Sequence, residues 1–193
     1  MLIGITGQIG AGKTEVAEVF KKMGAYVISA DKIGRDVVEK NKSILRRLVS
    51  VFGQGILTPS CKLRRRKLGE MALASDKNRK RLNRIVHPLL LKELSRQTKK
   101  ALQKNNIVVI DAALLINWGW DKKVDKTILV HAGDKIKMAR LIKKGYSPKE
   151  ARIRLNSQLK YKVLRSRADI VIFNNKSLES LRKRAEKIFS KLT

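Results

Sequence analysis

The chain has 193 residues, with 45 lysines and arginines against 16 acidic residues, a formal net charge of +29. This length suits one compact domain with an inserted segment, and 43% apolar residues are enough for a core. The apolar runs are far shorter than the roughly 18–20 residues of a membrane span, and no signal peptide is evident. The single Cys61 excludes an internal disulfide and a multi-cysteine metal site. We therefore expect a cytoplasmic protein with no membrane partner.

The positive charge is uneven along the chain. Residues 61–193 carry 36 of the basic residues and only 11 of the acidic ones. Such an excess could bind nucleic acid through its phosphates, draw a small polyphosphate substrate inward, or simply coat a solvated surface. The basic clusters at 62–67 and 77–84 have no interleaved aromatic residues, which argues against a base-stacking surface. A nucleic-acid-binding protein nevertheless stays open as an alternative class.

Apolar periodicity, glycines and prolines predict the secondary structure in chain order. We expect a strand at 2–6, a helix at 13–23, a strand at 25–29, a helix at 32–52 broken near Asn41, helical residues 63–103 interrupted at His87-Pro88, strands at 106–112 and 126–132, helices at 134–145 and 147–159, a strand at 169–174 and a helix at 177–191. The interruption is expected because proline lacks a backbone N–H and restricts the residue before it.

Short strands that alternate with helices predict an α/β fold. We expect a parallel five-stranded sheet with helices on both faces. The helical stretch 32–103 is too long for a simple crossover between two strands, so we expect it to form a separate lobe inserted into a core built from residues 1–31, 104–133 and 168–193.

The segment Gly7-Gln8-Ile9-Gly10-Ala11-Gly12-Lys13-Thr14 matches the phosphate-binding pattern G-x-x-x-x-G-K-[ST]. A predicted strand precedes it and an amphipathic helix follows, as the pattern requires. The small residues Gly7, Gly10, Ala11 and Gly12 let successive backbone N–H groups approach a phosphate. Lys13 would reach the β- and γ-phosphates, and the Thr14 hydroxyl would bind Mg²⁺. The sequence therefore predicts a site for nucleotide phosphates with Mg²⁺. The pattern alone does not separate a kinase from an ATPase, a GTPase or a nucleic-acid motor, although the chain has no N-K-x-D guanine signature.

Two aspartates follow predicted strands at the edge of the sheet where this loop lies. Asp31 comes just after the second strand, where a carboxylate could orient a substrate hydroxyl and accept its proton. It could instead cap the following helix, because aspartate is a favoured N-cap. Asp111 ends the strand 106–112, where a carboxylate could hold Mg²⁺ through water. A turn residue at the strand end is the alternative for Asp111.

With these motifs in place, the chain resembles the dephospho-coenzyme A kinase family over nearly its whole length. The resemblance rests on the order and spacing of "GITGQIGAGKT" (4–14), "VISADKIGRDVV" (27–38), "FGQGIL" (52–57), "LRRRKLGEMAL" (63–73), "HPLL" (87–90), "VVIDAALL" (108–115), "ARLIKKGYSPKEARIRLNSQ" (139–158) and "ADIVIFNN" (168–175). The chain departs from the family pattern at Ser29, Arg64, Ala113 and Asn117. Glu15 stands where a threonine is usual beside a phosphate, so only its backbone N–H can remain a contact.

The resemblance implies a P-loop kinase-type fold and transfer of the γ-phosphate of ATP to the ribose 3′-hydroxyl of dephospho-coenzyme A. In that reading Asp31 engages the 3′-hydroxyl, and Arg65 and His87 of the lobe contact dephospho-coenzyme A. A lid of about residues 134–167 supplies Arg140 to the phosphates, and Asn174 begins a loop that lies against adenine. Another P-loop kinase, with a different small-molecule acceptor, is the remaining alternative. The oligomeric state stays open.

Overall fold

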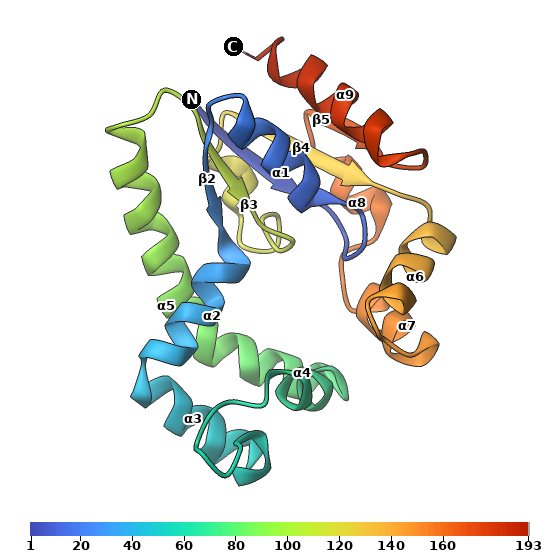
Figure 1. The fold of residues 1–193 in the computed structure, drawn as a ribbon. Helices are drawn as coiled ribbons and strands as arrows, with labels where there is room; N and C mark the ends of the chain where they lie inside the picture. Colours follow the sequence, from blue (N-terminus) through green and yellow to red (C-terminus); the bar gives the residue numbers. More distant parts are fainter. Residues whose placement is uncertain (193) are drawn as a thin grey trace. The chain divides into compact units, whose positions relative to one another are not determined.

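The computed structural model describes residues 1–192, and its centre is a sheet of five parallel strands. The strands are β1 (Leu2–Thr6), β2 (Tyr26–Ser29), β3 (Val108–Asp111), β4 (Lys126–His131) and β5 (Ile170–Phe173), arranged in the order β2-β3-β1-β4-β5 (Figure 1). Every neighbouring pair is parallel, with Ile5 opposite Asp111 and Ser29 also opposite Asp111. The predicted α/β fold is confirmed.

The helices follow the predicted order with a few differences. They are α1 (Lys13–Lys22), α2 (Ala30–Lys40), α3 (Lys42–Phe52), α4 (Arg65–Leu73), α5 (Asp76–Leu102), α6 (Asp134–Lys143), α7 (Pro148–Asn156), α8 (Tyr161–Arg165) and α9 (Leu178–Phe189), with short 3₁₀ helices η1 (Gln54–Ile56) and η2 (Trp120–Lys122). The break near Asn41 is confirmed, because the Asn41 side chain accepts a hydrogen bond from the Ile44 N–H and begins α3. The helix α8 was not predicted as a separate element.

The expected interruption at His87-Pro88 is wrong. Helix α5 runs through Pro88 for 27 residues. A proline removes only one hydrogen bond of the helix, and Ile85, Leu90 and Leu94 continue to bury apolar side chains on both sides of it. The helical stretch breaks earlier, where the Ser75 hydroxyl accepts a hydrogen bond from the Asn78 N–H at 3.1 Å. A serine that caps a new helix is therefore the stronger signal here.

The described chain forms two compact units. The first is Met1–Ser29 with Gln97–Thr193, of which residue 193 lies outside the described residues, and the second is Ala30–Arg96. The first unit contains the whole sheet. The second is helical, and its own core gathers apolar residues of α2, α3, α4 and α5 around Leu48 and Ile56, both fully buried.

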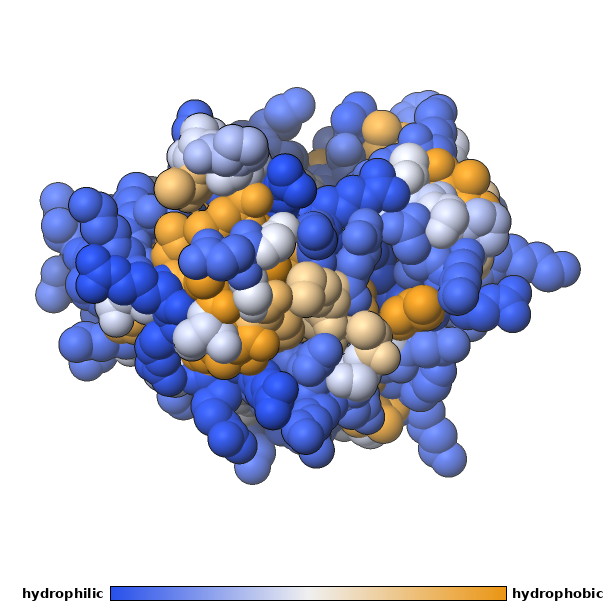
Figure 2. Space-filling view, turned by 90° about the horizontal axis from the view of Figure 1, so that it is seen from below, coloured by the Kyte–Doolittle hydropathy of each residue, from blue (hydrophilic) through white to orange (hydrophobic). Residues whose placement is uncertain are grey.

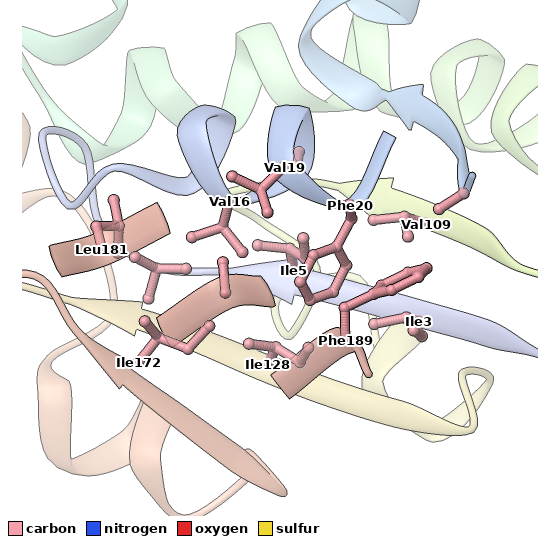
Figure 3. Packing of buried hydrophobic residues seen from close by; sticks show 14 of the residues in the cluster. Ile3, Ile5, Val16, Val19, Phe20, Val109, Ile128, Ile172, Leu181 and Phe189 are labelled. Atoms are coloured by element: carbon pink, nitrogen blue, oxygen red, sulfur yellow. The ribbon is translucent and has the colours of Figure 1, made fainter. Parts of the chain in front are cut away.

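In the first unit, helices α1 and α9 lie side by side on one face of the sheet (Figure 1). Phe20 of α1 and Phe189 of α9 meet with ring centroids 4.9 Å apart, over the strand residues Ile3, Val109 and Ile128 (Figure 3). The opposite face is covered by the segment around Ile116 and by Leu164 of α8, which pack on Leu129. Both faces are therefore covered, as a parallel sheet requires.

The surface reflects the composition. Hydrophilic residues dominate the face seen in Figure 2, and the apolar residues on it form one broad area left of the centre and smaller areas elsewhere. Within residues 1–192, no helix combines the length and the apolar character needed to cross a membrane.

Candidate active site

The loop between β1 and α1 has the close packing that its glycines predict. Gly7 has φ +146° and Gly12 has φ +103°, conformations that other residues rarely adopt. A Cβ atom on Gly7 would lie 2.2 Å from the Val130 carbonyl oxygen, and one on Gly12 would lie 2.3 Å from Asn174 Nδ2. The glycines therefore make the turn possible, and they also let β4 and the residue after β5 pack directly against the loop backbone.

The loop ends where α1 begins, at Lys13. The N–H groups of a helix N-terminus together carry a partial positive charge, which favours a bound phosphate. Thr14 lies in this first turn, and its Oγ1 is 3.4 Å from Asp111 Oδ2. Mg²⁺ usually keeps several of its water ligands, and a carboxylate next to a metal-binding hydroxyl can accept hydrogen bonds from such waters. The predicted pair Thr14 and Asp111 is thus brought together within hydrogen-bonding distance.

Arg140 of α6 joins the loop directly. Its guanidinium donates to the Gly10 carbonyl at 3.1 Å and to the Asn174 backbone and side-chain oxygens at 3.1 and 3.2 Å. Asn174 is buried, and its Nδ2 donates to the Ala11 carbonyl at 2.8 Å. The structure therefore gathers Gly10, Ala11, Arg140 and Asn174 into one network, with both ends of the Asn174 amide engaged inside the protein.

Glu15 makes contacts in its own turn and with helix α9. Its N–H donates to the Gly12 carbonyl at 3.2 Å, inside the first turn of α1. Its carboxylate accepts from Arg182 of α9 at 3.3 Å, in an ion pair that is half exposed. These bonds hold the first turn of α1 and tie α1 to α9.

Sequence reasoning missed a second set of residues around the loop. The Gln8 side chain accepts from Lys137 and donates to the Leu159 carbonyl at 3.0 Å, and the Ile9 N–H donates to Gln158 Oε1 at 2.8 Å. Lys137 also pairs with Asp134 at 2.7 Å, and this hydrogen bond lowers the pKa of the Asp134 carboxyl below its usual 3.8. Burial lowers the pKa of nearby His131 below 6.5, and the charge on Lys137 lowers it further.

Asp31, Arg65 and His87 belong to the second unit. Helix α2 begins at Ala30, directly after β2, so the exposed Asp31 is inside its first turn. The expectation that Asp31 caps this helix as its N-cap is corrected, because no residue separates strand from helix. Arg65 forms an ion pair with Glu39 near the other end of α2. His87 is half-buried in α5, and burial lowers its pKa below 6.5.

Comparisons with known proteins agree with one another. The family model described as "Dephospho-CoA kinase" matches residues 1–180. The dephospho-CoA kinase of Aquifex aeolicus is 34% identical over 191 residues, covering 99% of this chain and 97% of its own. A crystal structure of TT1252 from Thermus thermophilus superposes with a TM-score of 0.81 at 28% identity, covering 100% and 98% of the two chains. Dephospho-CoA kinase from Campylobacter jejuni has the same fold, with a TM-score of 0.67 at 24% identity and coverage of 100% and 97%.

Proposed function

The chain belongs to the dephospho-CoA kinase family and has dephospho-CoA kinase activity, and we propose how its residues divide the transfer of phosphate from ATP to the ribose 3′-hydroxyl of dephospho-coenzyme A. The observation that carries the proposal is the convergence on one loop of Thr14, Asp111, Arg140 and Asn174. Phosphoryl transfer needs little covalent work from a protein, so positioning and charge neutralisation account for most of the rate.

The loop binds the phosphates of ATP in this proposal. Its backbone N–H groups and the N-terminus of α1 face the anionic chain, and Lys13 offsets the charge that develops between the β- and γ-phosphates. Thr14 would hold Mg²⁺ through its hydroxyl and Asp111 through water, and the ion would supply positive charge that neutralises the phosphates. The hydrogen bond of 3.4 Å from the Thr14 hydroxyl to Asp111 Oδ2 supports this assignment, because it places the two side chains next to each other.

Arg140 provides a second positive charge at the loop. It is held by the Gly10 carbonyl and by Asn174, so its guanidinium lies beside the phosphate loop in the structure as described. We assign residues of about 134–167 to a lid on the nucleotide, with Arg140 as the group that meets the transferred phosphate. Asn174 acts on the nucleotide through the loop, since its amide is bonded to Ala11 and Arg140.

The acceptor side of the reaction is assigned to the second unit. Asp31 orients the 3′-hydroxyl and accepts its proton, as a carboxylate in reach of a substrate hydroxyl can. Arg65 and His87 contact dephospho-coenzyme A, the first by its charge and the second as a largely neutral hydrogen-bonding group. The lowered pKa of His87 supports the neutral form near pH 7. The lobe of about residues 32–103 is thus the proposed acceptor-binding part.

An acceptor screen with Mg-ATP tests the assignment. The enzyme is offered dephospho-coenzyme A, 3′-deoxy dephospho-coenzyme A, adenosine and shikimate, and transfer of labelled γ-phosphate is followed. We expect transfer to dephospho-coenzyme A and none to its 3′-deoxy analogue. Faster transfer to another acceptor would contradict the proposed substrate.

Asp31→Asn tests the proposed base. The variant keeps the shape of the side chain but loses its charge, and loss of a general base costs about 10²–10⁴-fold in rate. We expect turnover to fall at least about a hundredfold, with Mg-ATP affinity unchanged. Asp36→Asn is the matched control, because Asp36 lies on the same helix in an exposed pair with Lys40 and should change turnover by less than about twofold. Near-parental turnover of Asp31→Asn would move the base elsewhere.

A further inference from the structure

Lys137 is a buried lysine that no step of the proposed mechanism uses. Its side chain is 1% exposed, and among residues 1–192 it is the only lysine or arginine that is buried. A buried ammonium group is costly unless hydrogen-bonded partners offset its lost hydration. A surface helix such as α6 could place a lysine in solvent at no such cost. The burial of Lys137 therefore indicates that its contacts have a specific role.

The partners of Lys137 point toward the phosphate loop. Its ammonium donates to Gln8 Oε1 and pairs with Asp134 Oδ1 at 2.7 Å. Asp134 has an 86% exposed side chain and remains in contact with water. Gln8 is 7% exposed, and its Nε2 donates to the Leu159 carbonyl at 3.0 Å. Both ends of the Gln8 amide are thus fixed, one of them by Lys137.

The neighbours of Gln8 are held by the same part of the chain. The Ile9 N–H donates to Gln158 Oε1 at 2.8 Å. At Gly10, an added Cβ would be 3.1 Å from the Lys137 carbonyl oxygen and 3.3 Å from its Cα, so the backbone of α6 lies directly against the loop. Three consecutive residues of the phosphate loop are therefore in contact with the segment 137–159, and two of them, Gln8 and Gly10, lie against Lys137 itself.

We infer that Lys137 is a positioning residue for ATP binding, which acts by holding Gln8 and thereby the phosphate-binding conformation of residues 8–10. The inference rests on the proposed function of this loop. Lys137 has no role toward the acceptor in this account, because its partners belong to the loop and to the segment 134–159. Its loss raises the cost of ordering the loop around a phosphate and leaves the acceptor affinity unchanged.

The test is a double-mutant cycle of Lys137→Met and Gln8→Ala, in which KM for ATP, KM for dephospho-coenzyme A and the melting temperature are measured together. We expect each single variant to raise KM for ATP about tenfold, which corresponds to about 1.4 kcal/mol, with KM for dephospho-coenzyme A unchanged. We expect the double variant to resemble the single ones, since Lys137 acts through Gln8. Lys135→Met is the control, because Lys135 is an exposed residue of the same helix.

Several outcomes overturn the inference. A Lys137→Met enzyme with a lower melting temperature and an unchanged KM for ATP shows a purely structural lysine. If the increase in KM for ATP in the double variant equals the product of the two single increases, Lys137 does not act through Gln8. If Lys137→Met does not fold, Gln8→Ala alone decides, and a KM for ATP within about twofold of the parent refutes the inference. Failure of the parent enzyme to use Mg-ATP would refute the proposed function instead.

Discussion

Replacement of Gly7 by alanine is the most direct test of the loop geometry. Two costs add at this position. The φ of +146° is unfavourable for a residue with a side chain, which costs about 1–3 kcal/mol. The new Cβ would also lie 2.2 Å from the Val130 carbonyl oxygen. Because this oxygen belongs to the backbone of β4, which is paired with a strand on each side, no side-chain rotation relieves the overlap, and overpacking adds about 1–3 kcal/mol.

Gly24→Ala separates the two costs. Gly24 has φ +100° at the end of α1, but nothing lies within 4 Å of an added Cβ. We expect Gly24→Ala to lower the free energy of unfolding by about 2 kcal/mol and Gly7→Ala by about 4 kcal/mol. Only Gly7→Ala should also raise KM for ATP, by tenfold or about 1.4 kcal/mol, since the loop must move away from β4. Urea unfolding and steady-state kinetics measure both. Equal destabilisation by the two variants, with KM for ATP unchanged in both, would refute the close-approach argument.

Three further predictions concern charge. Lys13→Ala should keep the fold and lower turnover at least about a hundredfold, or some 2.7 kcal/mol, and turnover within a few-fold of the parent would contradict the phosphate-loop assignment. Arg140→Ala should lower kcat by about a hundredfold, whereas a raised KM for the acceptor with an unchanged kcat would make Arg140 a binding residue only. Burial lowers the pKa of His87 and of His131 below 6.5, so the unfolded chain binds more protons below that pH. The urea concentration at the midpoint of unfolding should therefore decrease as the pH is lowered from about 7 to about 5.5. The double variant His87→Gln/His131→Gln should show a smaller decrease over the same pH range.

The sequence was sufficient for the sheet and for the loop because their signals are local. Each strand is a short apolar run, and the glycine pattern of residues 7–14 is set by backbone geometry that only a few residue types permit. The order of the strands, β2-β3-β1-β4-β5, was not predicted. Asp111 could be placed next to Thr14 from the sequence, because parallel strands bring their carboxyl ends to one edge of the sheet.

What the sequence could not show depends on contacts between distant segments. Lysine is among the residues least often buried, so nothing in the pattern of α6 marks Lys137 as the partner of Gln8, 129 positions earlier. The continuity of α5 through Pro88 was missed for another reason. Proline usually interrupts a helix, but here α5 continues through Pro88. The break in the helical stretch lies instead at Ser75, whose hydroxyl caps the new helix.

The contacts of the loop also support the proposed indirect role of Asn174 in nucleotide binding, because its side-chain amide is bonded to Ala11 and Arg140 within the protein. A phosphate is repelled by carbonyl oxygens, so an anion site must turn them away. In the described loop, the Gln8 carbonyl accepts from the Ala11 N–H at 3.1 Å, and the Ala11 carbonyl accepts from Asn174. The C=O and N–H of a trans peptide point in opposite directions. Binding of the Ala11 carbonyl by Asn174 therefore directs the Gly12 N–H the other way. The residues behind the loop thus orient the N–H groups that a phosphate needs.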